Sequence, residues 1–325
     1  MNEQQGQSAA ASGSPGQWER EAISRLATAA LAEQRRSRRW GILFKSLALF
    51  YVFLFLFVVV NVDPLFGSRE QAPGPHVGLI DMEGMIVRGG DVDADRVATG
   101  LRRAFEHEET EAVILRINSP GGSPVQSDQI YNEIMRLREE HEDIPVYAVG
   151  GDIMASGAYY IASAADEIYV NPASIVGSIG VIFGGFGFDE AIERIGVERR
   201  VYASGDDKAL LDPFQPEDEG QIAHMRGLID EIHQQFIGAV EAGRGDRLNG
   251  DPDELFSGLV WTGNGAIERG LADGIGSTGQ VARDVIENDN LRDFTRRPPL
   301  LERLTQRMGA GVASGLRGYI EPGFR

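Results

Sequence analysis

Two stretches of the sequence decide the fold: AVILRINSPGGS at residues 112–123 and PVYAVGGDIMASGAYY at residues 145–160. Each stretch begins with a short apolar run that predicts a buried strand. Between them, residues 126–140 show the spacing of an amphipathic helix. This alternation predicts a right-handed βαβ unit, in which the glycine pair and Ser156 both follow the carboxyl ends of parallel strands.

The alternation continues on both sides of this unit, so the predicted fold class is α/β with a mostly parallel sheet and helices outside it. The strands are expected at 77–80, 85–87, 112–117, 145–149, 167–170, 180–183 and 198–202. The helices are expected at 94–107, 126–140, 156–165, 189–195, 216–242, 255–275 and 280–287. Internal repeats are not apparent in the 325 residues.

The ends of the chain differ in composition from its centre. We expect a disordered and basic tail at 1–40, a transmembrane helix at 41–62, a linker at 63–76, a catalytic domain at 77–290 and an amphipathic tail at 291–325. The cluster Arg35-Arg36-Ser37-Arg38-Arg39 before the apolar run predicts a cytoplasmic N-terminus and an extracytoplasmic domain. A cleaved signal peptide is the alternative, but residues 61–67 offer no small-x-small cleavage site.

The leucines of the last segment recur at helical spacing with arginines among them, from Leu300 to Leu316. Such a helix would contact a membrane surface, a neighbouring subunit or its own domain.

Composition excludes some functions. The net charge of −18 argues against nucleic-acid binding, and it is also typical of proteins that remain hydrated in concentrated salt, although an ordinary acidic protein is as compatible. The absence of cysteine excludes disulfides and thiolate chemistry.

Among 31 basic side chains only Lys45 and Lys208 are lysines. A lysine can lose its proton in a buried site whereas an arginine cannot, so Lys208 is either a general base or a leftover surface residue.

Ser156 and the glycine pair can each be interpreted either as ordinary local structure or as catalytic groups. A serine before a helix is often only its N-cap, but Ser156 lies between Ala155 and Gly157, which leave its hydroxyl accessible to a base. Ser-Pro-Gly-Gly is most often a simple turn, but glycines after a strand can also direct N–H groups toward an oxyanion.

A histidine base has little support in the sequence. The five histidines are His76, His107, His141, His224 and His233, and each is more typical of a surface position. The His-Glu-x-x-His zinc motif and the phosphate-binding glycine loop are absent, so neither metal nor cofactor is predicted. Lys208 therefore remains the candidate base for Ser156.

Several motifs, taken in order, resemble the signal peptide peptidase A family, membrane-anchored serine peptidases with a Ser/Lys dyad and a fold shared with the Clp protease and the crotonases. The matching stretches are 117–122, 154–162, 177–181 and 204–208. The resemblance implies that Ser156 is the nucleophile, Lys208 the general base, and Ser178 the residue that orients the lysine. It also implies that Gly122, or less directly Gly121, donates to the oxyanion.

The resemblance further implies a single-repeat endopeptidase that cleaves remnant signal peptides through an acyl-enzyme. It implies a ring-shaped homo-oligomer with sites at subunit interfaces, anchored in a bacterial-type inner membrane with its catalytic domain in the periplasm. Two alternatives remain. One is an interaction scaffold or quality-control protease that works with other membrane proteins, and the other is a crotonase-like acyl-CoA enzyme.

Overall fold

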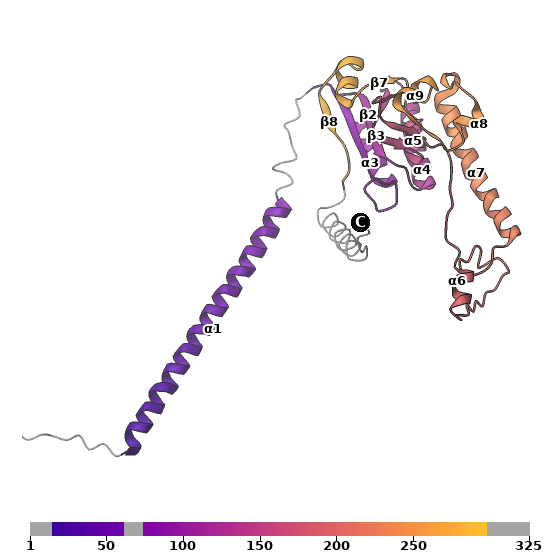
Figure 1. Ribbon diagram of the computed structural model, residues 1–325. Helices are drawn as coiled ribbons and strands as arrows, with labels where there is room; N and C mark the ends of the chain where they lie inside the picture. Colours follow the sequence, from indigo (N-terminus) through magenta and orange to yellow (C-terminus); the bar gives the residue numbers. More distant parts are fainter. Residues whose placement is uncertain (1–14, 62–73, 298–325) are drawn as a thin grey trace, which may run out of the picture. The chain divides into compact units, whose positions relative to one another are not determined.

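The computed structural model describes residues 15–61 and 74–297, and within the first range it leaves several side chains undescribed. The chain divides into two units at Glu70/Gln71. The first unit is described as a single helix, α1 (Pro15–Asn61), so residues 15–40 of the predicted disordered tail are helical and continue into the apolar run (Figure 1). Residues 1–14 of that tail and most of the predicted C-terminal tail lie outside the described residues.

The predicted transmembrane helix at 41–62 is not confirmed. Among the residues that the structure describes, no helix meets the length and apolarity needed to cross a membrane. Leu56 and the residues from Val58 to Val62 are outside the set whose side chains or placement are described. The membrane span therefore stays a prediction.

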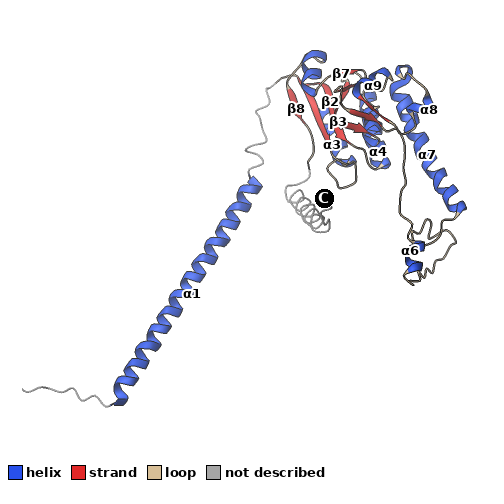
Figure 2. Ribbon diagram, viewed as in Figure 1, coloured by secondary structure: helices blue, strands red, loops and turns tan. Residues whose placement is uncertain are grey.

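The second unit is built on one sheet, as the apolar runs predicted (Figure 2). Its strands are β1 (His76–Glu83), β2 (Thr110–Ser119), β3 (Val146–Ala155), β4 (Glu167–Val170), β5 (Ile175–Gly177), β6 (Val260–Thr262), β7 (Gly274–Ile275) and β8 (Leu291–Asp293). The main path runs β6-β5-β3-β2-β1-β8, and among the described strands the β5–β6 pair is the one that is antiparallel. The prediction of a mixed α/β fold with a mostly parallel sheet is confirmed.

The sheet forks at β3. Residues 147–149 of β3 pair with β4, whereas residues 153–155 pair with β5. The strand changes partner after Gly150 and Gly151, where the Asn118 side chain approaches the backbone and accepts a hydrogen bond from Ile153 N–H at 3.2 Å. The fork lets the carboxyl end of β3 lie between β2 and β5, where the site is built.

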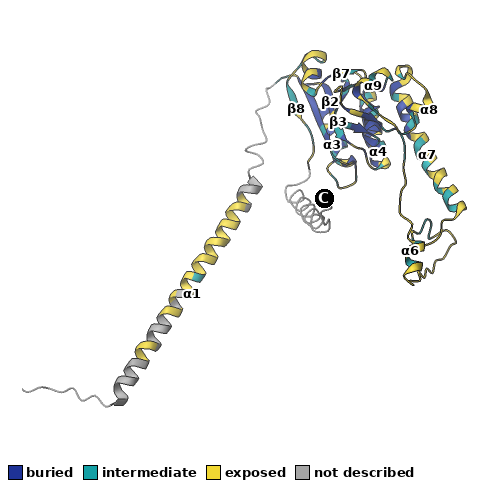
Figure 3. Cartoon of the chain, in the orientation of Figure 1, coloured by how far each residue is buried: buried dark blue, intermediate teal, exposed yellow. Residues whose placement is uncertain are grey.

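The helices cover the sheet unequally. They are α3 (Ala94–Phe105), α4 (Pro124–Glu140), α5 (Gly157–Ala162), α6 (Asp189–Arg194), α7 (Glu219–Arg244), α8 (Pro252–Leu255), α9 (Gly263–Glu268) and α10 (Thr278–Gln280), with a 3₁₀ turn at Gly245–Arg247 and a π-helical turn at Val281–Val285. The larger apolar core contains buried residues of α3, α4 and α5, and a smaller cluster on β1 and β2 includes Val281 and Ala282 of the π-helical turn. Figure 3 shows the buried residues concentrated in the sheet and its neighbouring helices.

Several predicted elements differ from the structure. Residues 180–183 and 198–202 form no strands. Their backbones do not pair with the sheet, and most of their apolar side chains are exposed and do not pack against it. Residues 85–87 contribute only two isolated bridges, from Ile86 to Val92 and to Gly122. The predicted helix at 255–275 is divided among α8, β6, α9 and β7. Leu291–Asp293, expected in the C-terminal tail, is instead strand β8 and pairs with β1.

A buried ion pair joins α7 to the strand β7 region. Arg244 has a fully buried side chain and donates to both carboxylate oxygens of Asp273 at 2.7 and 2.8 Å. Burial raises the pKa of Asp273, but the hydrogen bonds from Arg244 and from Ile168 N–H outweigh it and hold that pKa below its usual value. The Asp273 contribution to stability is therefore present above the pKa of an unfolded aspartate and is lost as pH falls toward the folded value.

We predict that Arg244→Ala lowers the free energy of unfolding at pH 7 by about 3 kcal/mol, because it removes a fully buried side chain and both of its hydrogen bonds to Asp273, which keeps only Ile168 N–H and the more distant Arg247 guanidinium. Urea unfolding of the full-length chain measures this change. Arg283→Ala is the control, since Arg283 pairs with Asp284 on the surface and its loss should change the free energy of unfolding far less than the loss of Arg244. Equal effects of the two substitutions would contradict the assignment.

Candidate active site

The carboxyl ends of three neighbouring strands meet at one edge of the sheet. Ser119 at the end of β2 pairs with Met154 of β3, and Ala155 at the end of β3 pairs with Gly177 at the end of β5. The segments that follow these ends begin with Pro120, Ser156 and Ser178. The structure therefore brings together three of the four motifs that the sequence singled out.

Ser156 occupies a strained turn between β3 and α5. Its φ and ψ angles are 54° and −128°, a conformation that costs a non-glycine residue on the order of 1–3 kcal/mol. Its N–H donates to the Gly177 carbonyl at 2.8 Å, and its own carbonyl accepts from Tyr159 and Tyr160 N–H. A strained strand-to-helix turn of this kind exposes the hydroxyl of a nucleophile. The Ser156 hydroxyl caps no helix N–H, so the N-cap interpretation is not supported.

The glycine pair packs directly on this turn. A Cβ added to Gly121 would lie 2.8 Å from Ser156 Cβ and 2.7 Å from Gly157 N. A Cβ added to Gly122 would lie 2.1 Å from the Ile86 carbonyl oxygen. Hydrogen bonds from Ile86 N–H to Gly121 O and from Ser123 N–H to Ile86 O hold the loop in this position. Only glycine fits at either residue without moving the backbone.

The two glycines differ in their N–H groups. Gly121 N–H donates to Ser119 Oγ at 3.1 Å and is therefore occupied. Gly122 N–H has no hydrogen-bond partner among the described residues, and the same holds for Gly157 N–H at the start of α5. The nitrogen of Gly122 lies 3.4 Å from the position of a Cβ on Gly157, so the two amides adjoin. Of the two predicted donors, this geometry favours Gly122.

Gly157 is a candidate donor that the sequence analysis missed. The amide that follows a serine nucleophile is a common part of an oxyanion hole, and this relation was the available signal. Helix α4 begins directly after the glycine loop, and α5 begins directly after Ser156. The partial positive charges at the N-termini of both helices favour an anion there.

Ser178 directly follows Gly177, whose carbonyl accepts the hydrogen bond from Ser156 N–H. It also has a positive φ, 53°, and its N–H donates to the Leu259 carbonyl at 2.7 Å. The next residue, Ile179, has its carbonyl 3.1 Å from Nε2 of His233 on α7. Because a carbonyl can only accept, His233 Nε2 carries the proton and serves to fix this loop. His233, expected at the surface, is half-buried.

Lys208 is not brought to Ser156 within the chain. It lies on residues 180–217, a segment that we call the arm, which carries α6 and is drawn at the end of α7 away from the sheet (Figure 1). Its side chain is exposed, and among the described residues its ammonium makes no hydrogen bond or ion pair. The Ser/Lys dyad therefore stays a prediction.

The arm is folded against the first turns of α7. Gln221 accepts from Leu211 N–H at 3.1 Å, and Phe188 N–H donates to the Pro213 carbonyl at 2.6 Å. Arg199 pairs with the buried carboxylate of Asp212. These contacts fix the turn that carries Lys208 relative to the amino-terminal part of α7.

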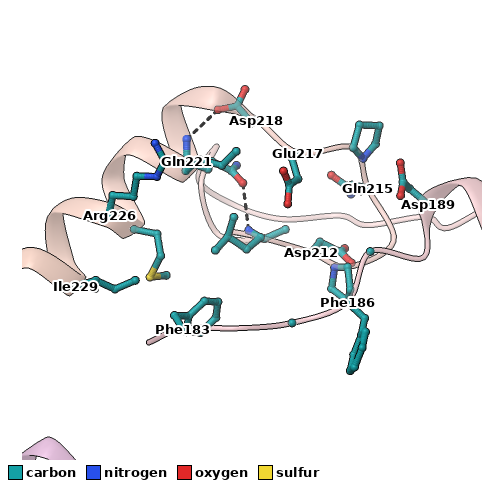
Figure 4. A pocket seen from close by; sticks show the side chains of 18 residues that line it. Phe183, Phe186, Asp189, Asp212, Gln215, Glu217, Asp218, Gln221, Arg226 and Ile229 are labelled. Atoms are coloured by element: carbon teal, nitrogen blue, oxygen red, sulfur yellow. Dashed lines mark hydrogen bonds between the residues drawn. The ribbon is translucent and has the colours of Figure 1, made fainter. Parts of the chain in front are cut away.

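A pocket of about 860 Å³ lies between the arm and α7 (Figure 4). Its lining combines apolar side chains such as Phe183 and Ile229 with the carboxylates of Asp189, Glu217 and Asp218. None of the residues at the three strand ends lines it. The pocket is therefore a feature of the arm and does not contain the candidate nucleophile.

Comparisons with known proteins identify the family. A sequence profile of peptidase family S49 matches residues 138–292. A putative signal peptide peptidase SppA of Enterococcus faecium is 31% identical over 235 residues, which cover 70% of this chain and 67% of the relative. The chain belongs to peptidase family S49, the signal peptide peptidase A family. The predicted family resemblance is confirmed.

A second relative is much longer than this chain. A protein named Na(+)/H(+) antiporter NhaA of Brucella melitensis is 45% identical over 217 residues, which cover 65% of this S49 chain and 29% of the relative. The chain thus spans less than a third of that relative's length. Among solved structures, a membrane-bound stomatin-specific protease in complex with a substrate peptide aligns with a TM-score of 0.42 and 15% identity, over 73% of this chain and 99% of its own.

We predict that Gly122→Ala lowers kcat for peptide hydrolysis by about 10²–10³-fold, the usual effect of losing one oxyanion donor. The added methyl group would collide with the Ile86 backbone and displace the Gly122 N–H. Gly238→Ala, on an exposed position of α7, is the matched control, because open space surrounds that position. A Gly122→Ala enzyme with wild-type kcat would refute the role of this loop.

Proposed function

We propose that the chain is a serine endopeptidase that cleaves remnant signal peptides and other apolar peptides. The single observation that carries the proposal is the Ser156 turn, in which a strained serine lies beside the adjoining Gly122 and Gly157 amides. The forked sheet also supports the finer prediction of a superhelical βαβ fold like that of the Clp protease and the crotonases. Family membership favours peptide hydrolysis over acyl-CoA chemistry.

In the proposed reaction, the neutral amine of Lys208 accepts the proton of the Ser156 hydroxyl as Oγ attacks the scissile carbonyl. The developing oxyanion accepts hydrogen bonds from Gly122 and Gly157 N–H. When the C–N bond breaks, the Lys208 ammonium returns the proton to the leaving amine. A water molecule, deprotonated by the same amine, then hydrolyses the acyl-enzyme and regenerates Ser156.

We propose that a second copy of the chain completes the site. Ile182, Phe186 and Tyr202 of the arm are 91%, 80% and 92% exposed in the single chain, although stable surfaces seldom expose so many large apolar groups together. Packing of arms in a ring-shaped homo-oligomer would bury these side chains. It would also remove Lys208 from water, which is the condition under which a lysine amine becomes a base.

We further propose that α1 anchors the protein in a bacterial-type inner membrane, with the N-terminus in the cytoplasm and the catalytic domain in the periplasm. From Trp40 to Phe57, every large apolar side chain of α1 that the structure describes is at least 42% exposed, so the chain itself does not cover them (Figure 3). The arginines between 35 and 39 support this orientation. Extraction of the full-length chain from membranes by alkaline carbonate alone would contradict the anchor.

Replacement of Lys208 by arginine tests the proton-transfer role. We expect Lys208→Arg to lower kcat for a fluorogenic apolar peptide by about 10²–10⁴-fold, because guanidinium keeps its proton while retaining length and charge. The control is Lys45→Arg, which changes the other lysine. Wild-type kcat in Lys208→Arg would remove Lys208 from the mechanism and return attention to a histidine, or to a scaffold role if Ser156→Ala also preserves function.

A further inference from the structure

Three side chains with metal-binding groups gather at the edge of the sheet opposite Ser156. They are His76, the first residue of β1, and His107 and Glu109 of the loop that precedes β2. One ligand atom from each lies within 4.8 Å of the other two. The two imidazole rings are 4.6 Å apart and nearly perpendicular. Because the strands are parallel, this amino-terminal edge is distinct from the carboxyl edge that carries the candidate active site.

Hydrogen bonds fix the tautomer of the buried histidine. His76 is 1% exposed, and its Nδ1 lies 3.2 Å from the Gly74 carbonyl, which can only accept a hydrogen bond. Nδ1 therefore carries the proton, and Nε2 has a lone pair, which accepts from the Thr110 hydroxyl at 3.2 Å. Zinc-binding histidines typically donate the second ring N–H to a carbonyl in this way, and the bond fixes the tautomer and the ring.

The backbone holds the loop against this ring. His76 N–H donates to the Glu109 carbonyl at 2.9 Å. Phe294, which follows β8, packs against both imidazoles, with ring centroids 5.9 Å from His76 and 5.8 Å from His107. The Glu109 backbone and the Phe294 ring therefore hold the loop beside His76, while the exposed Glu109 side chain stays free to turn.

The loop that carries two of the three groups is acidic. Glu106, Glu108 and Glu109 lie between the end of α3 and the start of β2. Their carboxylates offset the guanidinium charge of Arg292, which acts electrostatically on His107, for an approaching cation.

We propose that Nε2 of His76, one imidazole nitrogen of His107 and the Glu109 carboxylate bind a divalent transition metal of the zinc class. Three protein ligands of this type leave a fourth tetrahedral position for water. Metal–ligand bonds of about 2.0–2.2 Å require ligand atoms about 3.3 Å apart, so the cluster contracts by at most roughly 1.5 Å on binding. Glu109 is exposed and His107 only half-buried, so rotation of these two side chains provides the contraction while His76 stays in place.

The bound ion would cross-link two segments of the chain. It would join the first residue of β1 to the loop before β2, next to Phe294. The ligands lie at the amino-terminal edge of the sheet, away from the residues proposed for peptide hydrolysis. The site therefore stabilises the fold and takes no part in the reaction, and its test does not depend on peptidase activity.

The test uses full-length chain that is prepared without a histidine tag and stripped with a chelator. After addition of zinc chloride and gel filtration, elemental analysis should find one zinc ion per chain. Thermal unfolding at a zinc concentration about a hundredfold above Kd should occur roughly 5–10 °C higher than in the stripped protein. Cobalt(II) should give the visible absorption of a four-coordinate site.

Variants separate this site from adventitious binding. His107→Ala should lose both the bound zinc and the shift in Tm, and Glu109→Gln should bind zinc at least about tenfold more weakly. His224→Ala, which removes an exposed histidine of α7, should behave as wild type. His76 is left unchanged because it is buried and its replacement would disturb folding as well as metal binding. Equal zinc content in His107→Ala and wild type, or no zinc-dependent shift in wild type, would overturn the proposal.

Discussion

The hydrogen bond from Ser156 N–H to the Gly177 carbonyl is the constraint on which the candidate site depends. It fixes a serine at positive φ where the last residues of β3 leave β4 and pair with β5. Without the fork in the sheet, the end of β3 would not reach Gly177. A side chain at Gly121 would collide with this turn, so the loop after β2 packs against it only because residue 121 is a glycine. The strain at Ser156 is thus held by three strand ends at once.

The arm is the second feature on which the account depends, because it is held by its own contacts and still exposes several large apolar side chains. Its own contacts, such as the Arg199–Asp212 ion pair and the Gln221 hydrogen bond to Leu211, fix the turn around Lys208. They do not bury Ile182 or Tyr202. The free energy available from covering such side chains favours association, at roughly 25 cal/mol for each Å² of apolar area removed from water. Assembly and formation of a complete site are therefore expected to be one event.

The central elements could be predicted from the sequence because their periodicity is simple. The strands after residues 112 and 145 and the helix between them were correctly predicted, and so was the position of Ser156 at a strand end. The strands predicted at 180–183 and 198–202 were wrong because an apolar run does not reveal whether the sheet or another surface will cover it.

Other features depend on contacts between distant residues. The positive φ of Ser156 has no local signal, since glycine normally marks such a conformation and here the neighbours impose it. The pairing of β8 with β1 joins segments that lie about two hundred residues apart. His76, His107 and Glu109 match no spaced motif, and only the alignment of β1 with β2 brings them together.

Complementation between inactive chains tests the central claim most directly. Ser156→Ala and Lys208→Ala chains would be coexpressed, purified together through two different tags, and assayed on an apolar peptide beside each variant alone. If Lys208 of one copy serves Ser156 of another, the mixed assembly recovers a substantial part of wild-type activity while each variant alone remains inactive. A mixed assembly that forms normally but stays inactive would contradict a dyad shared between chains.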